Sequence, residues 1–139
     1  MLTIAAELRD AIVAHARRDH PVEACGLVCG PAGGDHAVRF VPVANDANSR
    51  TFYEFGSADL LALYTDMAKR GEDPIVIYHS HTASPAYPSP TDVSLAFEPD
   101  AHYVIVSTMA CGNGPGQVEF RSFRIVDAQI REEEVVVVD

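Results

Sequence analysis

Residues 74–81, with the sequence PIVIYHSH, place the strongest constraint on how this chain can fold. The segment is short and almost continuously apolar, which is typical of a β-strand buried on both faces of a sheet. Side chains alternate between the two faces of a strand, so His79 and His81 share one face. Ile75 and Ile77 are expected on that same face. We therefore expect two histidines to point the same way where this strand leaves the sheet.

Two longer segments have the apolar spacing of amphipathic helices. The first helix is predicted over residues 2 to about 18, and Pro21 follows its end. The second is predicted over residues 57–70, with Ser57 as its cap and Gly71 as its stop. The residues expected on the apolar faces are Ile4, Leu8, Ala11, Ile12 and His15 in the first helix and Leu60, Leu61, Tyr64 and Met67 in the second.

Shorter apolar segments predict the strands, at residues 24–29, 37–43, 74–80, 103–108, 118–126 and 130–138. The last two are expected to form a closing hairpin or an edge pair. Pro42 has no N–H for a ladder, so residues 37–43 belong at an edge or an end. Residues 51–55 are expected to form a short extended piece. This mixture favours an α/β (α+β) fold, and without a repeat or a dividing linker we expect one domain over residues 1–139.

Composition narrows the class of protein. A chain of 139 residues with 47% hydrophobic content suits one domain with a genuine core. No run of about 18 apolar residues is present, and the first 20 residues do not resemble a signal peptide, so a cytoplasmic protein without a membrane span is expected. The net charge is −10 and Lys69 is the only lysine, which argues against a nucleic-acid partner.

The three cysteines, Cys25, Cys29 and Cys111, are odd in number and lack CxxC spacing. In a cytosolic chain such residues are usually buried, reduced thiols. We therefore do not expect a cysteine-based metal site.

The two histidines of the buried strand suggest a metal site instead. Imidazole nitrogens are good zinc ligands, and a strand presents the pair with little loss of entropy. Asp92 can return from the following loop as a third ligand. Three protein ligands leave a fourth position for water, which is the arrangement of a catalytic zinc.

A simpler interpretation explains part of the same segment. Ser89, Pro90 and Asp92 fit a helix capping box with proline at the first helical position. Val93, Ala96 and Phe97 would be the apolar face of the helix that follows. This reading needs no metal for Ser89 and Asp92, but it does not explain the histidines. The joint pattern HxHx7SxxD would arise in roughly one shuffled chain in a thousand.

The pattern HSH, seven residues, Ser89, two residues and Asp92 resembles the signature of the JAMM (MPN+) metallopeptidases. The stretch HPVEACGLVCG around Glu23 is similar to the family's upstream P-x-E-x-C-G element. The resemblance covers almost the whole chain and implies a curved β-sheet flanked by helices, with one zinc ion per chain at the end of the sheet. It implies His79, His81 and Asp92 as the metal ligands.

The resemblance also assigns roles to Glu23 and Ser89. Glu23 would be the catalytic acid and base, although the residues alone leave Glu54 and Glu98 equally plausible. Ser89 would be the catalytic donor to the oxyanion of the tetrahedral intermediate. Because Ser89 cannot fully serve as both helix cap and oxyanion donor, we favour the second role. One residue departs from the pattern, since many members have proline where this chain has Thr82.

The stretches HSHTASPAYPSPTD, FYEF and EPDAHYV make the chain most similar to the actinobacterial Mec-type branch of the family. This similarity implies a partner, a small ubiquitin-like sulfur-carrier protein with a Gly-Gly tail, carried as its cysteine adduct. Hydrolysis of the amide between the terminal glycine and cysteine would release cysteine for cysteine biosynthesis. Residues 52–54 and Tyr87 are candidates for the groove that holds the tail.

Other functions stay open. The chain could cleave another ubiquitin-like protein, as an isopeptidase or tail-processing peptidase, or be a noncatalytic MPN-like scaffold. A zinc deaminase is disfavoured because the H-x-E and P-C-x-x-C elements are absent. A cysteine hydrolase built on Cys25 is disfavoured because its GLVCG setting is typical of a core. The sequence makes no prediction of the oligomeric state.

Overall fold

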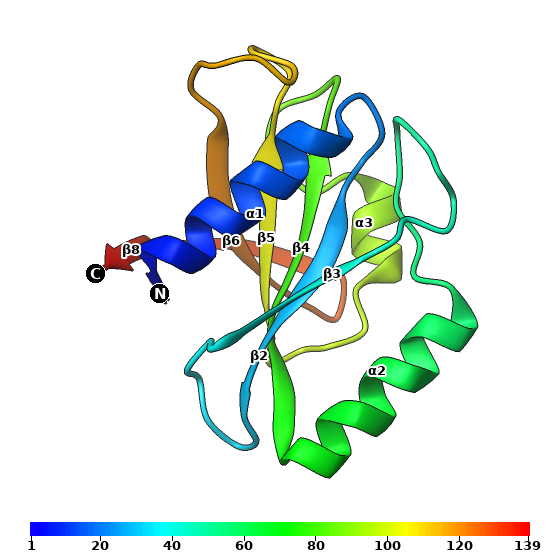
Figure 1. The fold of residues 1–139 in the computed structure, drawn as a ribbon, viewed down its shortest axis with the longest axis vertical. Helices are drawn as coiled ribbons and strands as arrows, with labels where there is room; N and C mark the ends of the chain where they lie inside the picture. The colour runs from blue at the N-terminus through cyan, green and yellow to red at the C-terminus, as the bar shows by residue number, and fades with distance from the viewer.

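The computed structural model describes all residues from Met1 to Asp139. A six-stranded sheet has the order β3-β2-β4-β5-β6-β7, and a small second sheet pairs β1 with β8 (Figure 1). The strands are β1 (Leu2–Ala5), β2 (Cys25–Pro31), β3 (Arg39–Val43), β4 (Glu72–His81), β5 (His102–Ser107), β6 (Glu119–Val126), β7 (Gln129–Glu133) and β8 (Val135–Val138). The helices are α1 (Ala6–Asp19), α2 (Ser57–Arg70) and α3 (Pro90–Leu95).

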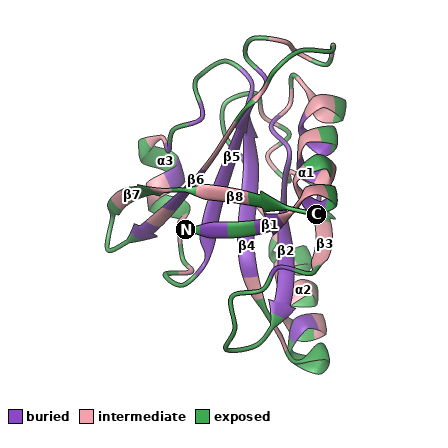
Figure 2. Cartoon of the chain, turned by 90° about the vertical axis from the view of Figure 1, so that its left-hand side faces the viewer, coloured by how far each residue is buried: buried purple, intermediate pink, exposed green.

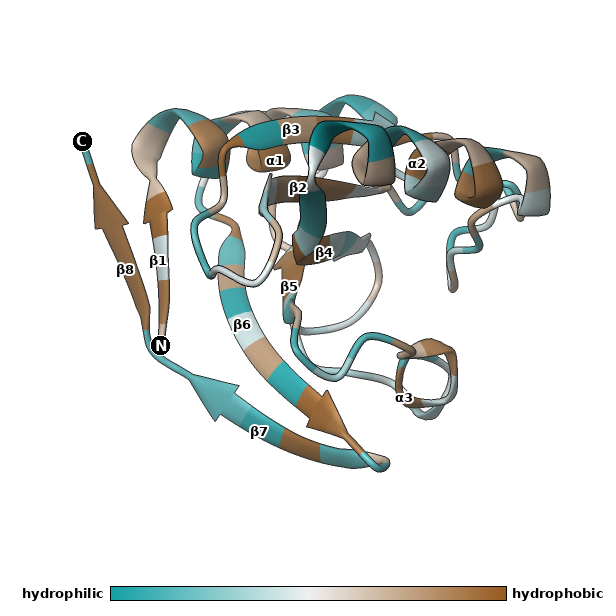
Figure 3. Ribbon diagram, turned by 90° about the horizontal axis from the view of Figure 1, so that it is seen from below, coloured by the Kyte–Doolittle hydropathy of each residue, from teal (hydrophilic) through white to brown (hydrophobic).

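The large sheet is curved and covered on both faces. Seen from below, β6 and β7 bend away from the plane of β2, β4 and β5 and partly enclose α3 (Figure 3). One core cluster joins α1 and the small sheet to one face, through residues such as Leu2, Ile12 and Val104. A second cluster lies on the other face, where Met67 of α2 packs with Ile77 and Phe123. The α+β class and the curved, helix-flanked sheet predicted from the sequence are confirmed.

Strand β4 lies in the middle of this sheet, antiparallel to β2 and parallel to β5. Its residues from Ile75 to His81 are all buried, as the sequence predicted (Figure 2). A β-bulge interrupts the alternation: Val28 pairs with Val76 and Cys29 with Pro74, which leaves Ile75 without a partner. Ile75 therefore joins the cluster under α1 and not the face of Ile77. The prediction that placed Ile75 on the face of the histidines is wrong.

The first four residues of the predicted N-terminal helix form a strand. Leu2 and Ile4 are buried while Thr3 is exposed, and β1 pairs in parallel with β8. The helix begins only at Ala6, so Ile4 is not on its face. The error has a physical reason, because the partner strand comes from the other end of the chain and no local pattern shows it.

Helix α2 has the predicted bounds but a different cap. Gly56 is the N-cap, without a side-chain hydrogen bond, and Ser57 is the first helical residue. Gly71 ends the helix in the left-handed region, with φ 68°. Leu61, expected on the apolar face, is 71% exposed, and Leu63 packs against the core in its place.

The C-terminal region was only partly predicted. Strands β6 and β7 form the expected hairpin, with Asp127 and Ala128 in a two-residue turn at positive φ. The segment expected as one strand over 130–138 breaks at Glu134, and β8 leaves to pair with β1.

Strand β3 lies at the edge of the sheet, as Pro42 indicated. Residues 51–55 form no strand.

The three cysteines are free, and Cys25 and Cys29 are buried. Burial raises the pKa of the Cys25 thiol to about 12, with the charge of Asp19 adding to the effect. A thiol of this kind is a poor nucleophile at neutral pH. The helices α1, α2 and α3 all lack the length and hydrophobicity that a membrane span requires.

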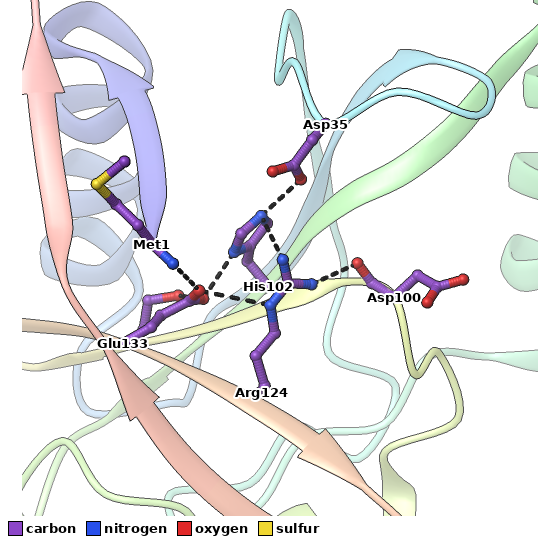
Figure 4. A network of polar contacts seen from close by, with 7 residues as sticks. Met1, Asp35, Asp100, His102, Arg124 and Glu133 are labelled. Atoms are coloured by element: carbon purple, nitrogen blue, oxygen red, sulfur yellow. Dashed lines mark hydrogen bonds and ion pairs between the residues drawn. The ribbon is translucent and has the colours of Figure 1, made fainter.

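A polar network surrounds His102 at the start of β5 (Figure 4), where β5 pairs with Val76 and not with the histidines at the end of β4. The buried His102 places Nδ1 2.6 Å from Glu133 and Nε2 2.7 Å from Asp35. The α-amino group of Met1 forms an ion pair with Glu133 at 2.9 Å, and Arg124 lies 3.4 Å from the same carboxylate. Glu133 therefore links the N-terminus, β7 and β5.

We predict that Glu133→Gln destabilises the protein in a pH-dependent way. Burial alone would raise the pKa of Glu133, but hydrogen bonds from His102, Ser122 and the N-terminus outweigh it and lower the pKa from 4.5 to about 2. A lowered pKa stabilises the fold above about pH 4.5, and this contribution is lost as the pH falls toward 2. After allowance for solvent screening, we expect a loss of about 1–2 kcal/mol at pH 7.

Urea unfolding of both proteins at pH 7, 5 and 3 measures this difference. Glu134→Gln is the matched control, since Glu134 is the neighbouring, exposed residue directly after the strand. A wild-type advantage over Glu133→Gln that is the same at all three pH values would contradict the prediction.

Candidate metal centre

The two histidines of β4 meet the aspartate of α3 at one point. The Nε2 atoms of His79 and His81 lie 3.2 Å apart. Asp92 Oδ2 lies 3.1 Å from Nε2 of His79 and 2.9 Å from Nε2 of His81. All three residues are at most 4% exposed. The structure therefore brings together the three residues that the sequence suggested as ligands.

Neighbouring groups fix the orientation of both rings. The carbonyl of Pro85 accepts a hydrogen bond from His81 Nδ1 at 2.8 Å, which fixes a proton on Nδ1 and turns Nε2 toward Asp92. The ring of Tyr53 stacks on His79, with centroids 4.4 Å apart. Each imidazole is thus held with Nε2 toward Asp92.

A capping box holds the aspartate. Ser89 Oγ accepts a hydrogen bond from the Asp92 N–H at 3.1 Å, and Asp92 Oδ2 accepts one from the Ser89 N–H at 2.9 Å. Pro90 is the first residue of α3, so the predicted helix start is confirmed. The cap uses a lone pair of the Ser89 hydroxyl and leaves its O–H available to donate. The expected conflict between capping and donating is therefore removed.

The spacing of the three ligand atoms fits a tetrahedral ion. Ligands at about 2.0–2.1 Å from a tetrahedral zinc lie about 3.3–3.4 Å from one another. The observed separations of 2.9–3.2 Å are only slightly shorter. Two neutral imidazoles and a carboxylate are also a donor set that zinc accepts. The residues present therefore fit a zinc ion.

Glu23 lies beside this group, just before β2. Ligand atoms of Glu23, His79 and His81 all lie within 4.8 Å of one another. Glu23 is buried, and its Oε1 has no hydrogen-bond partner in the protein. Buried polar atoms are nearly always paired, so an unpaired carboxylate oxygen indicates a group meant for an ion, a water or a substrate. Glu23 can thus be a fourth ligand or a base.

The charges in the site follow from burial and hydrogen bonding. Burial raises the pKa of Glu23 to about 8, and the nearby charge of Asp92 adds to this, while His81 opposes it. Burial would also raise the pKa of Asp92, but hydrogen bonds from His79 and His81 hold it well below its ordinary value. Burial lowers the pKa of His79. Asp92 is therefore the fixed negative charge of the site.

The other candidates from the sequence are not part of this cluster. Glu54 is exposed in the loop before α2. Glu98 accepts a hydrogen bond from the Tyr64 hydroxyl. Tyr87 is half exposed and packs edge-on against Phe123, on β6.

Comparison with known proteins identifies the family. The family model for prokaryotic homologs of the JAB domain matches residues 5–126. The chain belongs to this family. A curated relative from Mycobacterium tuberculosis, named CysO-cysteine peptidase, is 53% identical over 139 residues, which is all of this chain and 92% of the relative. A relative from Haloferax volcanii, named desampylase, is 34% identical over 111 residues, which cover 76% of this chain and 80% of the relative.

Solved structures share the fold. A protein from Desulfitobacterium hafniense is similar with a TM-score of 0.82 and 33% identity, over 100% of this chain and 94% of that one. A JAB1/MPN domain protein from Archaeoglobus fulgidus is similar with a TM-score of 0.59 and 21% identity, over the whole of both chains. The second likeness shows the fold alone. The family resemblance drawn from the sequence motifs is confirmed.

Sequence reasoning missed the groups that orient this JAB site. The hydrogen bond from His81 to the Pro85 carbonyl could not be predicted from residue types, because the acceptor is a backbone group. The stacking of Tyr53 on His79 joins residues 26 positions apart, and only the FYEF resemblance had drawn attention to that stretch. Thr82 departs from the family pattern, and that pattern predicts no contact for it.

We predict that variants of this site separate the ligands from the neighbouring carboxylate. His81→Ala and Asp92→Asn should weaken zinc binding by more than about 100-fold, because each removes one of three ligands. Glu23→Gln should still bind about one zinc per chain, since Gln keeps the shape and removes only the charge. Metal content after dialysis, measured by atomic emission, tests this.

Glu54→Gln is the matched control, because it removes an exposed carboxylate outside the cluster. Loss of zinc in Glu23→Gln with retention in Asp92→Asn would show that Glu23 is the third ligand in place of Asp92.

Proposed function

We propose that this chain is a zinc-dependent peptidase acting on a small ubiquitin-like sulfur-carrier protein. It would hydrolyse the amide bond between the carrier's C-terminal glycine and cysteine, and so release cysteine for cysteine biosynthesis. The observation that carries the proposal is the convergence of His79, His81 and Asp92, with the unpaired carboxylate of Glu23 beside them. The choice of substrate is supported by the 53% identity to a CysO-cysteine peptidase along the whole chain.

His79, His81 and Asp92 would hold one zinc ion, and the buried ionised carboxylate of Asp92 would offset part of its charge. Zinc bound there supplies a Lewis acid that polarises a carbonyl and lowers the pKa of water to about 7. The hydrogen bonds to Pro85 and from Ser89 keep the ligands in place without further rearrangement.

Glu23 would move the proton. It accepts a proton from the attacking water as the water oxygen bonds to the carbonyl carbon, and it passes that proton to the amine nitrogen as the C–N bond breaks. Burial raises the pKa of Glu23 to about 8 in the metal-free site, and the charge of a neighbouring zinc ion would lower that pKa toward neutrality. A group with such a pKa can both take up and release a proton at working pH.

Ser89 would stabilise the negative charge that develops on the carbonyl oxygen. Its Oγ already accepts a hydrogen bond from the Asp92 N–H, so the hydroxyl group is oriented and its proton is available. Loss of one such donor typically lowers turnover by about 10²–10³.

A small apolar pocket lies beside the site and supports a protein tail as substrate. It has a volume of about 200 Å³ and is lined by Tyr53, Glu54, Phe55, Leu60, Leu95 and Phe97. Tyr53 connects it to the site, because the same ring stacks on His79. We infer that an apolar side chain of the carrier's tail enters this pocket and positions the scissile carbonyl. A chain with a net charge of −10 would favour apolar or basic carrier residues.

A second candidate is an isopeptidase or tail-processing peptidase for another ubiquitin-like protein, and the relative named desampylase supports it. A noncatalytic scaffold is disfavoured, because nothing in such a role requires an unpaired buried glutamate beside three potential ligands. The cytoplasmic location stays a prediction.

We predict efficient removal of cysteine from the carrier's C-terminus by the zinc-loaded protein. Lysine-linked ubiquitin chains and short free peptides should be cleaved poorly, because most binding energy comes from the carrier's tail and globular surface. Mass spectrometry of the intact carrier follows the loss of one cysteine residue. Glu23→Gln should lower turnover by about 10²–10⁴ while it keeps its zinc. Cleavage of short peptides as fast as the carrier adduct would overturn the substrate assignment.

We also predict that Phe97→Ser weakens substrate binding. Phe97 is 48% exposed, so its loss should cost little folding stability, but it removes an apolar wall of the pocket. KM for the carrier adduct should rise about tenfold with little change in kcat. Leu61→Ser is the matched control, since Leu61 is 71% exposed on α2 and does not line the pocket. An equal rise in KM for both variants would contradict the role of the pocket.

A further inference from the structure

Thr82, the residue directly after the second histidine, forms an unusual contact. It is 8% exposed, and its Oγ1 lies 3.1 Å from the carbonyl oxygens of both Pro21 and Arg50. One hydroxyl proton is thus shared between two carbonyls from segments far apart in the sequence. The first segment connects α1 to β2, and the second is the long connection between β3 and α2 (Figure 1).

Both segments determine where Glu23 lies. The N–H of Glu23 donates to the carbonyl of Ser49 at 2.8 Å, next to Arg50 in the second segment. The carbonyl of Glu23 accepts a hydrogen bond from Asn45 Nδ2 at 3.0 Å, also from the second segment. Pro21 lies two residues before Glu23 in the first segment. Thr82 therefore joins the strand that bears the histidines to both pieces of chain that hold Glu23.

We propose that Thr82 is a positioning residue that holds Glu23 at the distance from His79 and His81 that proton transfer requires. Without its hydroxyl, the carbonyls of Pro21 and Arg50 lose their shared donor, and the segments are free to move away from the end of β4. A displacement of about 1 Å at a reacting group can lower the rate by about 100-fold. The catalytic part of this inference rests on the proposed function, whereas the tether itself does not.

The test compares Thr82→Val, which keeps the shape and removes the hydroxyl, with Thr82→Ser, which keeps the hydroxyl. In metal-free protein, amide hydrogen exchange followed by NMR should be at least about tenfold faster at the Glu23 N–H in Thr82→Val, because its bond to Ser49 opens more often. In zinc-loaded protein, kcat on the carrier adduct should fall about 10–100-fold with KM within about twofold of wild type. Thr82→Ser should restore both values.

Ser107→Ala is the matched control for exchange. Ser107, on β5, is 4% exposed and donates to the carbonyl of Ser84 at 2.7 Å. It thus binds the connection after His81 and makes no hydrogen bond to either segment that holds Glu23. It should leave exchange at the Glu23 N–H unchanged. If Thr82→Val does not fold, Thr82→Ala replaces it, with the melting temperature recorded for each variant.

Wild-type exchange at Glu23 in Thr82→Val would overturn the tether. Faster exchange with unchanged kcat would overturn the role in the reaction. Failure of the wild-type protein to cleave the carrier adduct would refute the proposed function, and with it the positioning of Glu23 for that reaction, while exchange would still decide whether Thr82 ties the two segments to β4.

Discussion

The carboxylate of Asp92 is the interaction on which the site depends. Its Oδ2 accepts a hydrogen bond from the Ser89 N–H and lies within 3.1 Å of Nε2 of both His79 and His81. A buried carboxylate is unfavourable unless it is paired, and here each partner also has a structural role. The backbone of Ser89 starts α3, and the histidines end β4. The same oxygen therefore fixes α3 against the sheet and collects the ligand atoms at one point.

Those parts of the fold that local pattern determines were predicted well. Helix α2 has the predicted bounds, because its apolar spacing and the left-handed Gly71 are both local signals. The buried strand β4 and the start of α3 were likewise predicted, from the apolar run and from the capping box. The errors at Ile4, Ile75 and Glu134 share one cause: a distant partner strand decides whether a residue is helical, bulged or outside a strand. Tertiary pairing overrides local periodicity at such positions.

The site residues also divide into those that local spacing predicts and one that it does not. His79, His81 and Asp92 lie within 14 residues of one another, so their spacing alone suggested a shared ligand set. Glu23 comes from a connection 56 residues before His79, and only the family resemblance distinguished it from Glu54 and Glu98. The structure adds what no pattern contains, namely the unpaired Oε1 of Glu23.

The alternation of β4 explains why one strand can serve both halves of this site. On one side, His79 and His81 reach Asp92. Ser80, between the two histidines, accepts a hydrogen bond from the N–H of Ala24 at 2.8 Å. Thr82, directly after His81, donates toward the Pro21 carbonyl. One set of residues thus supplies ligands while the interleaved set holds the chain around Glu23. Because the period is two, a slip of one residue would exchange the two sets and lose both functions at once. The pairing of β4 with β2 and β5, which sets its register, is therefore also what sets the distance between the proposed base and the proposed metal.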